Sequence, residues 1–374
     1  MINKQRLIKL TQDLIRINSE NPPGDERAIA AFVAGFLKRA GLQPKIVRFA
    51  SRRDNVLVVL KGRRHANSVL VTPHLDTVPA GKGWRWQPFS GVLRRGRIYG
   101  RGATDCKGNL AVAMEVMASL SEDRISLPHD VIFLATADEE TGSGLGLVPF
   151  LQRNLIKPSY AVVLDSDEFK IITVQKGLMH FKVKVSGRKA HGAYPDRGIN
   201  AIDHAVRLIG VLKNLKFAYR RHRLLKPPTV NIGTIRGGDK VNMVADWCEF
   251  EADLRYLPGM KADVILSGMR KAFDKTGVGY RLEIQDIQQP YEISRKHPLV
   301  RALKAACSGR RCRIQGSEGA TVITFFKKKN IPAVATGYGS SGCAHATDEY
   351  VAVADLARGA LTLERFLKIF KSKG

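Results

Sequence analysis

The sequence predicts an α/β protein in which a mostly parallel sheet, with helices on both faces, is interrupted by an inserted α+β sandwich domain. A chain of 374 residues is longer than one hydrophobic core usually serves, so two domains are expected. In the first half, short continuous apolar runs alternate with helical stretches, as in parallel strands buried on both faces. From about residue 176 the runs alternate apolar with polar residues, which indicates strands with one exposed face.

The N-terminal part supplies most of the expected parallel sheet. Residues 2–15 carry apolar side chains at helical spacing with charges between them, which predicts an amphipathic helix and not a secretion signal. Runs rich in Val, Ile and Leu predict strands over 55–62, 68–74, 130–137 and 160–165. A helix is expected over 107–120. No run approaches about 18 uncharged apolar residues, so no membrane span is expected.

The middle part predicts the inserted domain. "HFKVKVSG" places Phe181, Val183 and Val185 on one face and polar residues on the other, as in a half-exposed strand. A helix, two further alternating strands, a second helix and a last strand follow. This order predicts a small α+β sandwich. We expect a catalytic domain formed by residues 1–174 and 288–374, with a lid or dimerisation domain formed by residues 175–287.

The charge of the chain is strongly basic. Lys and Arg number 61 against 34 Asp and Glu, a formal net charge of +27. We find no zinc-finger spacing, aromatic RNA-binding signature or helix-turn-helix, so nucleic acid is not expected as a partner. The basic groups are spread over the chain and are interpreted as a surface bias that could steer anionic substrates or an acidic partner.

The five cysteines are scattered and odd in number, which fits a reducing cytoplasm. Cys307 and Cys312 lie five positions apart, without a second pair that would complete a zinc site. A cytoplasmic protein is therefore expected.

Polar residues of metal-binding type follow several of the predicted strands. Ligands in open α/β sheets gather at the carboxyl ends of the strands, so these residues are expected to converge. Each one alone has a plain structural explanation, such as a helix N-cap for Asp105. Their repeated occurrence at strand ends predicts one site. The residues are His74 and Asp76 after one strand, Asp138, Glu139 and Glu140 after the next, Asp165 and Asp167 after a third, and Asp105 and His345 in glycine-containing loops.

Histidine nitrogen and carboxylate oxygen are ligands that favour Zn²⁺, with Mn²⁺ or Co²⁺ as alternatives. Two metal ions close together require a bridging carboxylate, an arrangement common in aminopeptidases. The doublet Glu139-Glu140 can supply one ligand and one general base for the attacking water.

Four segments together make a family recognisable. "HLDTVP", "GRGATDCKG", "DEETGSG" and "AHATDEY" resemble the M20 metallopeptidase family, in its acetylornithine deacetylase and succinyl-diaminopimelate desuccinylase branch. "GRKAHGAYPDRGINAI" and "DLRYLPG" resemble the lid or dimerisation domain of that family. The resemblance covers nearly the whole chain and implies a homodimer.

The resemblance implies a metal-ligand set. His74 and Asp165 are expected to bind one metal ion, Glu140 and His345 the other, and Asp105 both. Asp167 is a rival of Asp165, because many relatives have the longer Glu side chain at the equivalent of residue 165.

The resemblance also implies roles around the metal ions. Asp76 is expected to orient His74, and Glu139 to move a proton from the attacking water to the leaving amine. His191 is expected to polarise the scissile carbonyl, from the other subunit of a dimer. Arg255 and Asn242 are expected to hold the substrate's carboxylate, for which a guanidinium fork is well shaped.

The implied activity is hydrolysis of the amide of an N-acyl amino acid with two divalent metal ions, Zn²⁺ being the expected one. A dipeptidase or carboxypeptidase of the same family is an alternative. A third possibility is a non-catalytic basic binding protein on this scaffold.

Overall fold

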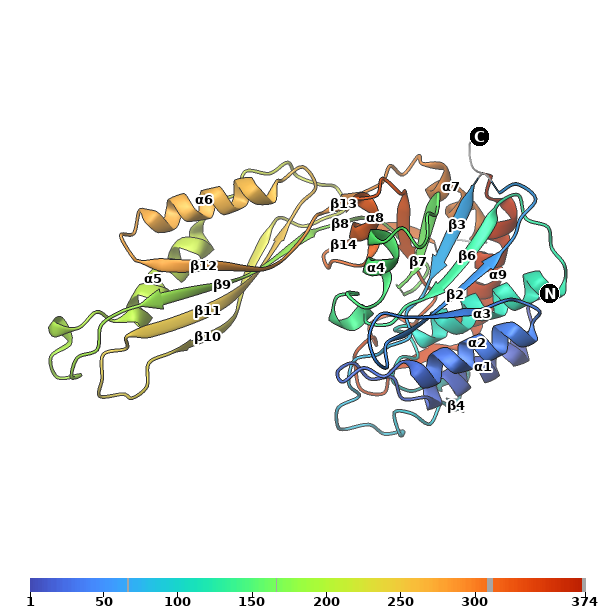
Figure 1. The fold of residues 1–374 in the computed structure, drawn as a ribbon, viewed down its shortest axis with the longest axis horizontal. Coiled ribbons are helices and arrows are strands. Elements are labelled where there is room, and N and C mark those ends of the chain that lie inside the picture. The colour runs from blue at the N-terminus through green and yellow to red at the C-terminus, as the bar shows by residue number, and fades with distance from the viewer. Residues whose placement is uncertain (66, 166, 308–311, 372–374) are drawn as a thin grey trace. The chain divides into compact units, whose positions relative to one another are not determined.

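The computed structural model describes the chain except for residues 66, 166, 308–311 and 372–374 (Figure 1). Contacts divide the chain into two compact units. The first unit comprises Met1–Thr173, Ile293–Gln315 and Thr321–Gly374, and the second comprises Val174–Glu292 and Gly316–Ala320.

The first unit is built on a mixed sheet. Its strand order is β1 (Lys45–Arg48), β2 (Asp54–Leu60), β6 (Asp130–Ala135), β3 (Ser68–Thr72), β7 (Tyr160–Leu164), β15 (Ala333–Thr336) and β8 (Lys170–Gln175). The four strands β6, β3, β7 and β15 are parallel, and antiparallel strands flank them on both sides. Every residue of β6 and β15 is buried, which explains their uninterrupted apolar sequences. The predicted mostly parallel sheet is confirmed.

Helices cover both faces of this sheet. One layer contains α1 (Lys4–Arg16), α2 (Arg27–Arg39), α3 (Lys107–Glu122), α7 (Pro298–Ala306) and α9 (Val353–Ile369). The short helices α4 (Leu147–Gln152) and α8 (Ile323–Lys327) pack together, and Figure 1 shows them on the other side of the strands. Helix α3 is buried over nearly its whole length because it packs between β6 and the helices α1 and α9.

A small antiparallel sheet was not predicted from the sequence. Its order is β16 (Tyr350–Ala352), β5 (Arg97–Tyr99) and β4 (Val92–Arg94). It places the 92–99 hairpin beside residues that follow His345 closely in the chain. Two remaining strands adjoin β8: β14 (Arg313–Ser317) and β13 (Tyr291–Glu292).

The second unit has the predicted order of strands and helices. Its four-stranded antiparallel sheet runs β10 (Thr229–Gly237), β11 (Trp247–Tyr256), β9 (Gly177–Ser186) and β12 (Tyr280–Gln288). Helices α5 (Ala201–Asn214) and α6 (Ala262–Asp274) pack on it. Phe181, Val183 and Val185 lie in the core between sheet and helices, as their alternation predicts.

The structure also bears on the expected absence of a membrane span and on the state of the cysteines. No helix among the described residues is long and apolar enough to cross a membrane. The sulfur atoms of Cys307 and Cys312 are joined as a disulfide, a pairing that the sequence analysis did not anticipate. Cys106, Cys248 and Cys343 are free and buried.

Candidate metal centre

Five side chains from separate loops of the first unit gather at one edge of its sheet. His74 follows β3, Asp165 follows β7, and Glu140 lies in a 3₁₀ turn after β6. These three strands are neighbours and parallel, so their carboxyl ends meet. Asp105 precedes α3, and His345 lies in the loop between β15 and β16.

Asp105 lies between the two histidines. Its Oδ1 is 3.0 Å from His74 Nε2, and its Oδ2 is 3.1 Å from His345 Nε2. Asp165 Oδ1 is 3.7 Å from His74 Nε2, and Glu140 Oε1 is 3.3 Å from His345 Nε2. The result is two sets of three residues that share Asp105, with the donor atoms of each set within 4.8 Å of one another.

This donor set fits divalent cations. Imidazole nitrogen and carboxylate oxygen are the ligand types of Zn²⁺ and of similar ions. Glu140 Oε1 is buried and accepts no hydrogen bond of good geometry from the described residues, although His345 Nε2 lies 3.3 Å away. A buried anionic oxygen without a donor is costly, and a cation beside it would satisfy it.

Asp76 connects the histidine to the glutamate doublet. Its carboxylate is fully buried and accepts hydrogen bonds from the backbone N–H groups of Glu139 and Glu140, both at 3.1 Å. His74 Nδ1 lies 3.0 Å from the backbone oxygen of Asp76 and 3.4 Å from its Oδ1. If Nδ1 donates to the backbone oxygen in the neutral ring, the Nε2 lone pair is available to a metal ion; without a metal ion, a protonated Nε2 can donate to Asp105.

Glu349 positions Asp105, a role that the sequence analysis missed. Its buried carboxylate accepts hydrogen bonds from the backbone N–H groups of Gly102, Thr104 and Asp105 at 2.8–3.0 Å. Arg101 Nη1 donates to Glu349 Oε2 over 2.7 Å and is itself 2% exposed. Both residues lie in motifs that the sequence analysis quoted: Glu349 in "AHATDEY" and Arg101 in "GRGATD".

A second buried arginine holds the loop before the doublet. Arg53 Nη2 lies 2.7 Å from Asp138 Oδ1 and 3.0 Å from Glu26 Oε1. Asp138 also accepts the backbone N–H of Leu145 at 2.9 Å. Its φ of 65° is left-handed, so these contacts hold a conformation that a non-glycine residue rarely adopts. The sequence contained no pattern that linked Arg53 to this loop.

Crowding of carboxylates alters their proton affinity. Burial raises the pKa of Glu139 well above its usual value, and the charge of Asp165 adds to this effect. Burial likewise raises the pKa of Asp165 to about 6. Burial opposes ionisation of Asp105 too, but hydrogen bonds from His345 and His74 outweigh it and lower its pKa. The hydrogen bond to Asp105 raises the pKa of His345 to about 10.

The other predicted site residues lie elsewhere. Asp167 is not part of either set and pairs with Lys170 Nζ over 2.5 Å. His191, Asn242 and Arg255 belong to the second unit. There the backbone of Asn242 accepts the N–H of Gly192, which places it beside His191, whose side chain is exposed. Arg255 pairs with Asp253 through Nε and Nη2, at 2.7 and 2.9 Å.

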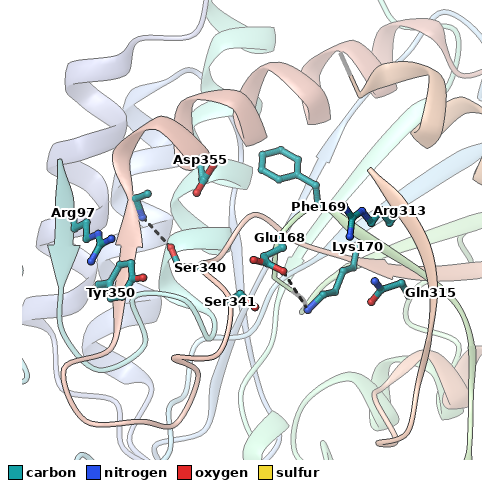
Figure 2. A pocket seen from close by; sticks show the side chains of 11 residues that line it. Arg97, Glu168, Phe169, Lys170, Arg313, Gln315, Ser340, Ser341, Tyr350 and Asp355 are labelled. Atoms are coloured by element: carbon teal, nitrogen blue, oxygen red, sulfur yellow. Dashed lines mark hydrogen bonds and ion pairs between the residues drawn. The ribbon is translucent and has the colours of Figure 1, made fainter. Parts of the chain in front are cut away.

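A hollow of about 520 Å³ lies in the first unit (Figure 2). Arg97 and Tyr350 line it from the small sheet, Lys170 from β8 and Arg313 from β14. None of the five clustered residues lines it. The hollow is therefore distinct from the metal centre, although Lys170 follows Asp165 closely in the chain.

Known proteins resemble this chain in sequence over most of its length. Residues 70–369 match the model of peptidase family M20/M25/M40. The acetylornithine deacetylase of Pasteurella multocida is 28% identical over 350 residues, which cover 90% of this chain and 89% of that protein.

Solved structures share the fold. Aminopeptidase PepT from Bacillus cereus superposes with a TM-score of 0.80 at 22% identity, over 98% of both chains. A dinuclear metal-binding peptidase of the M20 family from Bacillus subtilis superposes with a TM-score of 0.74 at 16% identity, also over 98% of both chains.

Proposed function

The chain belongs to peptidase family M20/M25/M40 and is a hydrolytic enzyme, and from this premise we propose that it hydrolyses the amide bond of an N-acyl amino acid with two divalent metal ions. The observation that carries the proposal is the pair of histidine–carboxylate sets that share Asp105, with Glu139 next to one of their members. The name of the Pasteurella relative supports an acyl group on an amino acid as the substrate.

Each metal ion would have its own pair of ligands. His74 and Asp165 would hold one ion, Glu140 and His345 the other, and Asp105 would contact both. Bound ions of this kind polarise a carbonyl and increase the acidity of water. The residues around them act as rigid supports, because Asp76 and Glu349 fix the backbone at Glu140 and Asp105 through five N–H hydrogen bonds in all.

Glu139 is the proposed general base. Its backbone N–H is held by Asp76 Oδ1, which restricts the position of its side chain. Burial raises the pKa of Glu139, which increases the affinity of its carboxylate for a proton. Glu139 accepts a proton from the attacking water and returns it to the nitrogen of the leaving amine.

His191 is proposed to stabilise the oxyanion of the tetrahedral intermediate. Its Nδ1 accepts the backbone N–H of Ala193 over 3.0 Å, so the ring proton resides on Nε2. An exposed Nε2–H can donate a hydrogen bond to a developing oxyanion. We further propose that His191 acts in the centre of the other subunit of a homodimer.

Arg255 and Asn242 are proposed to bind the substrate's carboxylate. Asp253 accepts hydrogen bonds from Nε and Nη2 of Arg255, and no hydrogen bond donated by Nη1 is found among the described residues. The Asn242 side chain is exposed on the neighbouring strand connection. Both groups can donate to a carboxylate oxygen.

The experiment is a measurement of amine release from N-acetylornithine, N-succinyl-diaminopimelate, other N-acetyl amino acids and dipeptides. The enzyme is first depleted of metal and then reloaded with Zn²⁺ or Co²⁺. Release from an N-acyl amino acid, absent with the Glu139→Gln variant, supports the proposal. Release from dipeptides alone would replace it with a dipeptidase function. An enzyme that binds two metal ions but releases nothing from the whole panel contradicts the proposed substrate class.

A further inference from the structure

The small sheet β16–β5–β4 presents one exposed face with an unusual composition. In its register Val92, Tyr99 and Tyr350 form one row, and Arg94, Arg97 and Ala352 form a second. Alternate rows point to opposite faces. The row between them faces inward: Ile98 and Val351 are fully buried, whereas Leu93 on the edge strand β4 remains 42% exposed. The arginines and tyrosines therefore share the outer face.

Two arginines lie directly opposite each other on this face. Arg94 pairs with Arg97 across the β4–β5 ladder, and like charges in such positions repel. Each guanidinium lies over an aromatic ring: Arg94 is 4.6 Å from the centre of Trp86, and Arg97 is 4.3 Å from the centre of Tyr350. Tyr99 contacts both rings, with centroid distances of 6.5 and 5.5 Å. The face is thus a row of three rings carrying two cations.

The cations of this face have no acidic residue in their own segment of the chain. Residues 82–99 contain no Asp or Glu, and their basic side chains are exposed. None of those side chains forms an ion pair in the part of the chain that the structure describes. Elsewhere in that part, some exposed basic residues, such as Lys184, pair with acids and others, such as Lys45, do not. The five basic residues are Lys82, Arg85, Arg94, Arg95 and Arg97.

The hollow described above continues this face. Arg97, Tyr350 and Ala352 belong both to the small sheet and to the lining of the hollow. Figure 2 shows Arg97 and Tyr350 on one side of the hollow, with Arg313 and Gln315 on the other. Arg313 carries no ion pair among the described residues. A ligand that crosses the sheet face would therefore meet another unpaired guanidinium beyond it. The carboxylates of Glu168 and Asp355 also line the hollow, and they form ion pairs with Lys170 and Arg358.

We propose that this face, formed by Trp86, Arg94, Arg97, Tyr99 and Tyr350, binds single-stranded nucleic acid. Unpaired arginines match successive phosphates, and aromatic rings and guanidinium planes stack on unpaired bases. An acidic peptide would use the cations but would leave the row of rings without a function. This face could not be predicted from the sequence, because residues 86–99 contact Tyr350 only in the folded protein.

The test is fluorescence anisotropy with a labelled oligothymidylate of about 15 nucleotides, a length that single-strand sites commonly span. Arg94→Gln with Arg97→Gln should weaken binding at least tenfold. It should also reduce the slope of log affinity against log salt by about 1.4, that is, about 0.7 for each lost phosphate contact. Trp86→Leu should weaken binding about fivefold or more through lost stacking. The matched control is Arg39→Gln with Lys45→Gln, which removes the same charge from exposed residues of the same unit.

Competition separates the proposal from plain charge attraction. A duplex of equal length and polyglutamate of equal charge should both compete at least tenfold less well than the single strand. Binding should persist in Glu139→Gln, because it does not depend on turnover. Equal competition by polyglutamate, equal loss in the control variant, or no binding at physiological salt would each overturn the proposal. The competition uses the unmodified protein, so it decides the matter even if a variant does not fold.

Discussion

Glu349 Oε1 accepts a hydrogen bond from the backbone N–H of Asp105 over 3.0 Å, although 244 positions separate the two residues in the chain. The same carboxylate accepts the N–H groups of Gly102 and Thr104 and binds the buried Arg101. The loop that carries the shared ligand of the proposed metal centre is thus held from the C-terminal part of the chain. Glu349 is therefore expected to affect metal binding by fixing the position of Asp105.

Glu349→Gln is expected to weaken both metal binding and folding. The buried Arg101 would lose its charged partner, which costs about 3 kcal/mol or more of unfolding free energy. Loss of a group that supports a ligand typically lowers metal affinity about 10- to 100-fold. Urea unfolding and competitive metal titration measure the two effects. Glu364→Gln, which breaks the helical Glu364–Lys368 pair, is the control and should change neither by much. Unchanged metal affinity would show that Glu349 supports the fold alone.

Glu139→Gln is expected to reduce turnover by at least about 10²- to 10⁴-fold, the usual contribution of a general base. Two metal ions per chain should remain, because Glu139 belongs to neither ligand set. Amine release and elemental analysis of the purified variant measure the two quantities. Loss of metal in this variant would mean that the roles of Glu139 and Glu140 are exchanged.

Asp165→Ala and Asp167→Ala should differ in metal content. Asp165 lies 3.7 Å from His74, so its loss should leave one tightly bound ion per chain. Asp167 is paired with Lys170, and its loss should leave two. Asp105→Ala should weaken the binding of both ions, because Asp105 belongs to both ligand sets. Equilibrium dialysis with Zn²⁺ counts the ions. A one-ion Asp167→Ala protein would make Asp167 the ligand.

Glu26 should make stability depend on pH. Burial raises the pKa of Glu26 from 4.5 to about 7, against the opposing effect of Arg53. The folded state then holds this proton more tightly than the unfolded chain, so the contribution to stability is present at low pH and is lost as the pH rises toward 7.

Glu26→Gln removes this titration. Between about pH 5 and about pH 8, the free energy of unfolding of the variant relative to the parent should rise by about 2 kcal/mol. Chemical denaturation at both pH values gives the difference, and any fixed effect on Arg53 cancels. A difference that stays constant with pH would exclude a raised pKa at Glu26.

The proposed sharing of His191 between subunits can be tested by complementation. His191→Ala and Glu139→Gln should each be inactive as pure proteins. If His191 of one subunit serves the other subunit's centre, mixed dimers contain one centre with both groups intact. Mixing after mild dissociation should then restore up to about a quarter of the parent activity, the share expected when half the dimers are mixed and each has one working centre. No recovery in dimers shown to be mixed would place His191 in its own subunit's centre.

Several features of this protein could be deduced from local sequence pattern. Apolar continuity in the first half and alternation after residue 176 predicted the two kinds of sheet, because burial on one or two faces selects side chains residue by residue. The strand-end residues were expected to converge, and the resemblance to a known family selected His74, Asp105, Glu140, Asp165 and His345 among them. The structure brings these five together. For His74, Glu140 and Asp165 this inference was possible because adjacent parallel strands end at one edge.

Other features depend on contacts between distant parts of the chain. Glu349 and Arg53 hold loops that lie 244 and 85 positions away, and no local pattern encodes such hydrogen bonds. The separation of Asp165 from Asp167 rests on the direction of each side chain after β7 and on the nearby Lys170. The arginine and aromatic face likewise exists only because β16 pairs with β5. Hydrophobic periodicity shows which side chains of one element are buried. These arrangements depend instead on which residues from distant parts of the chain come into contact.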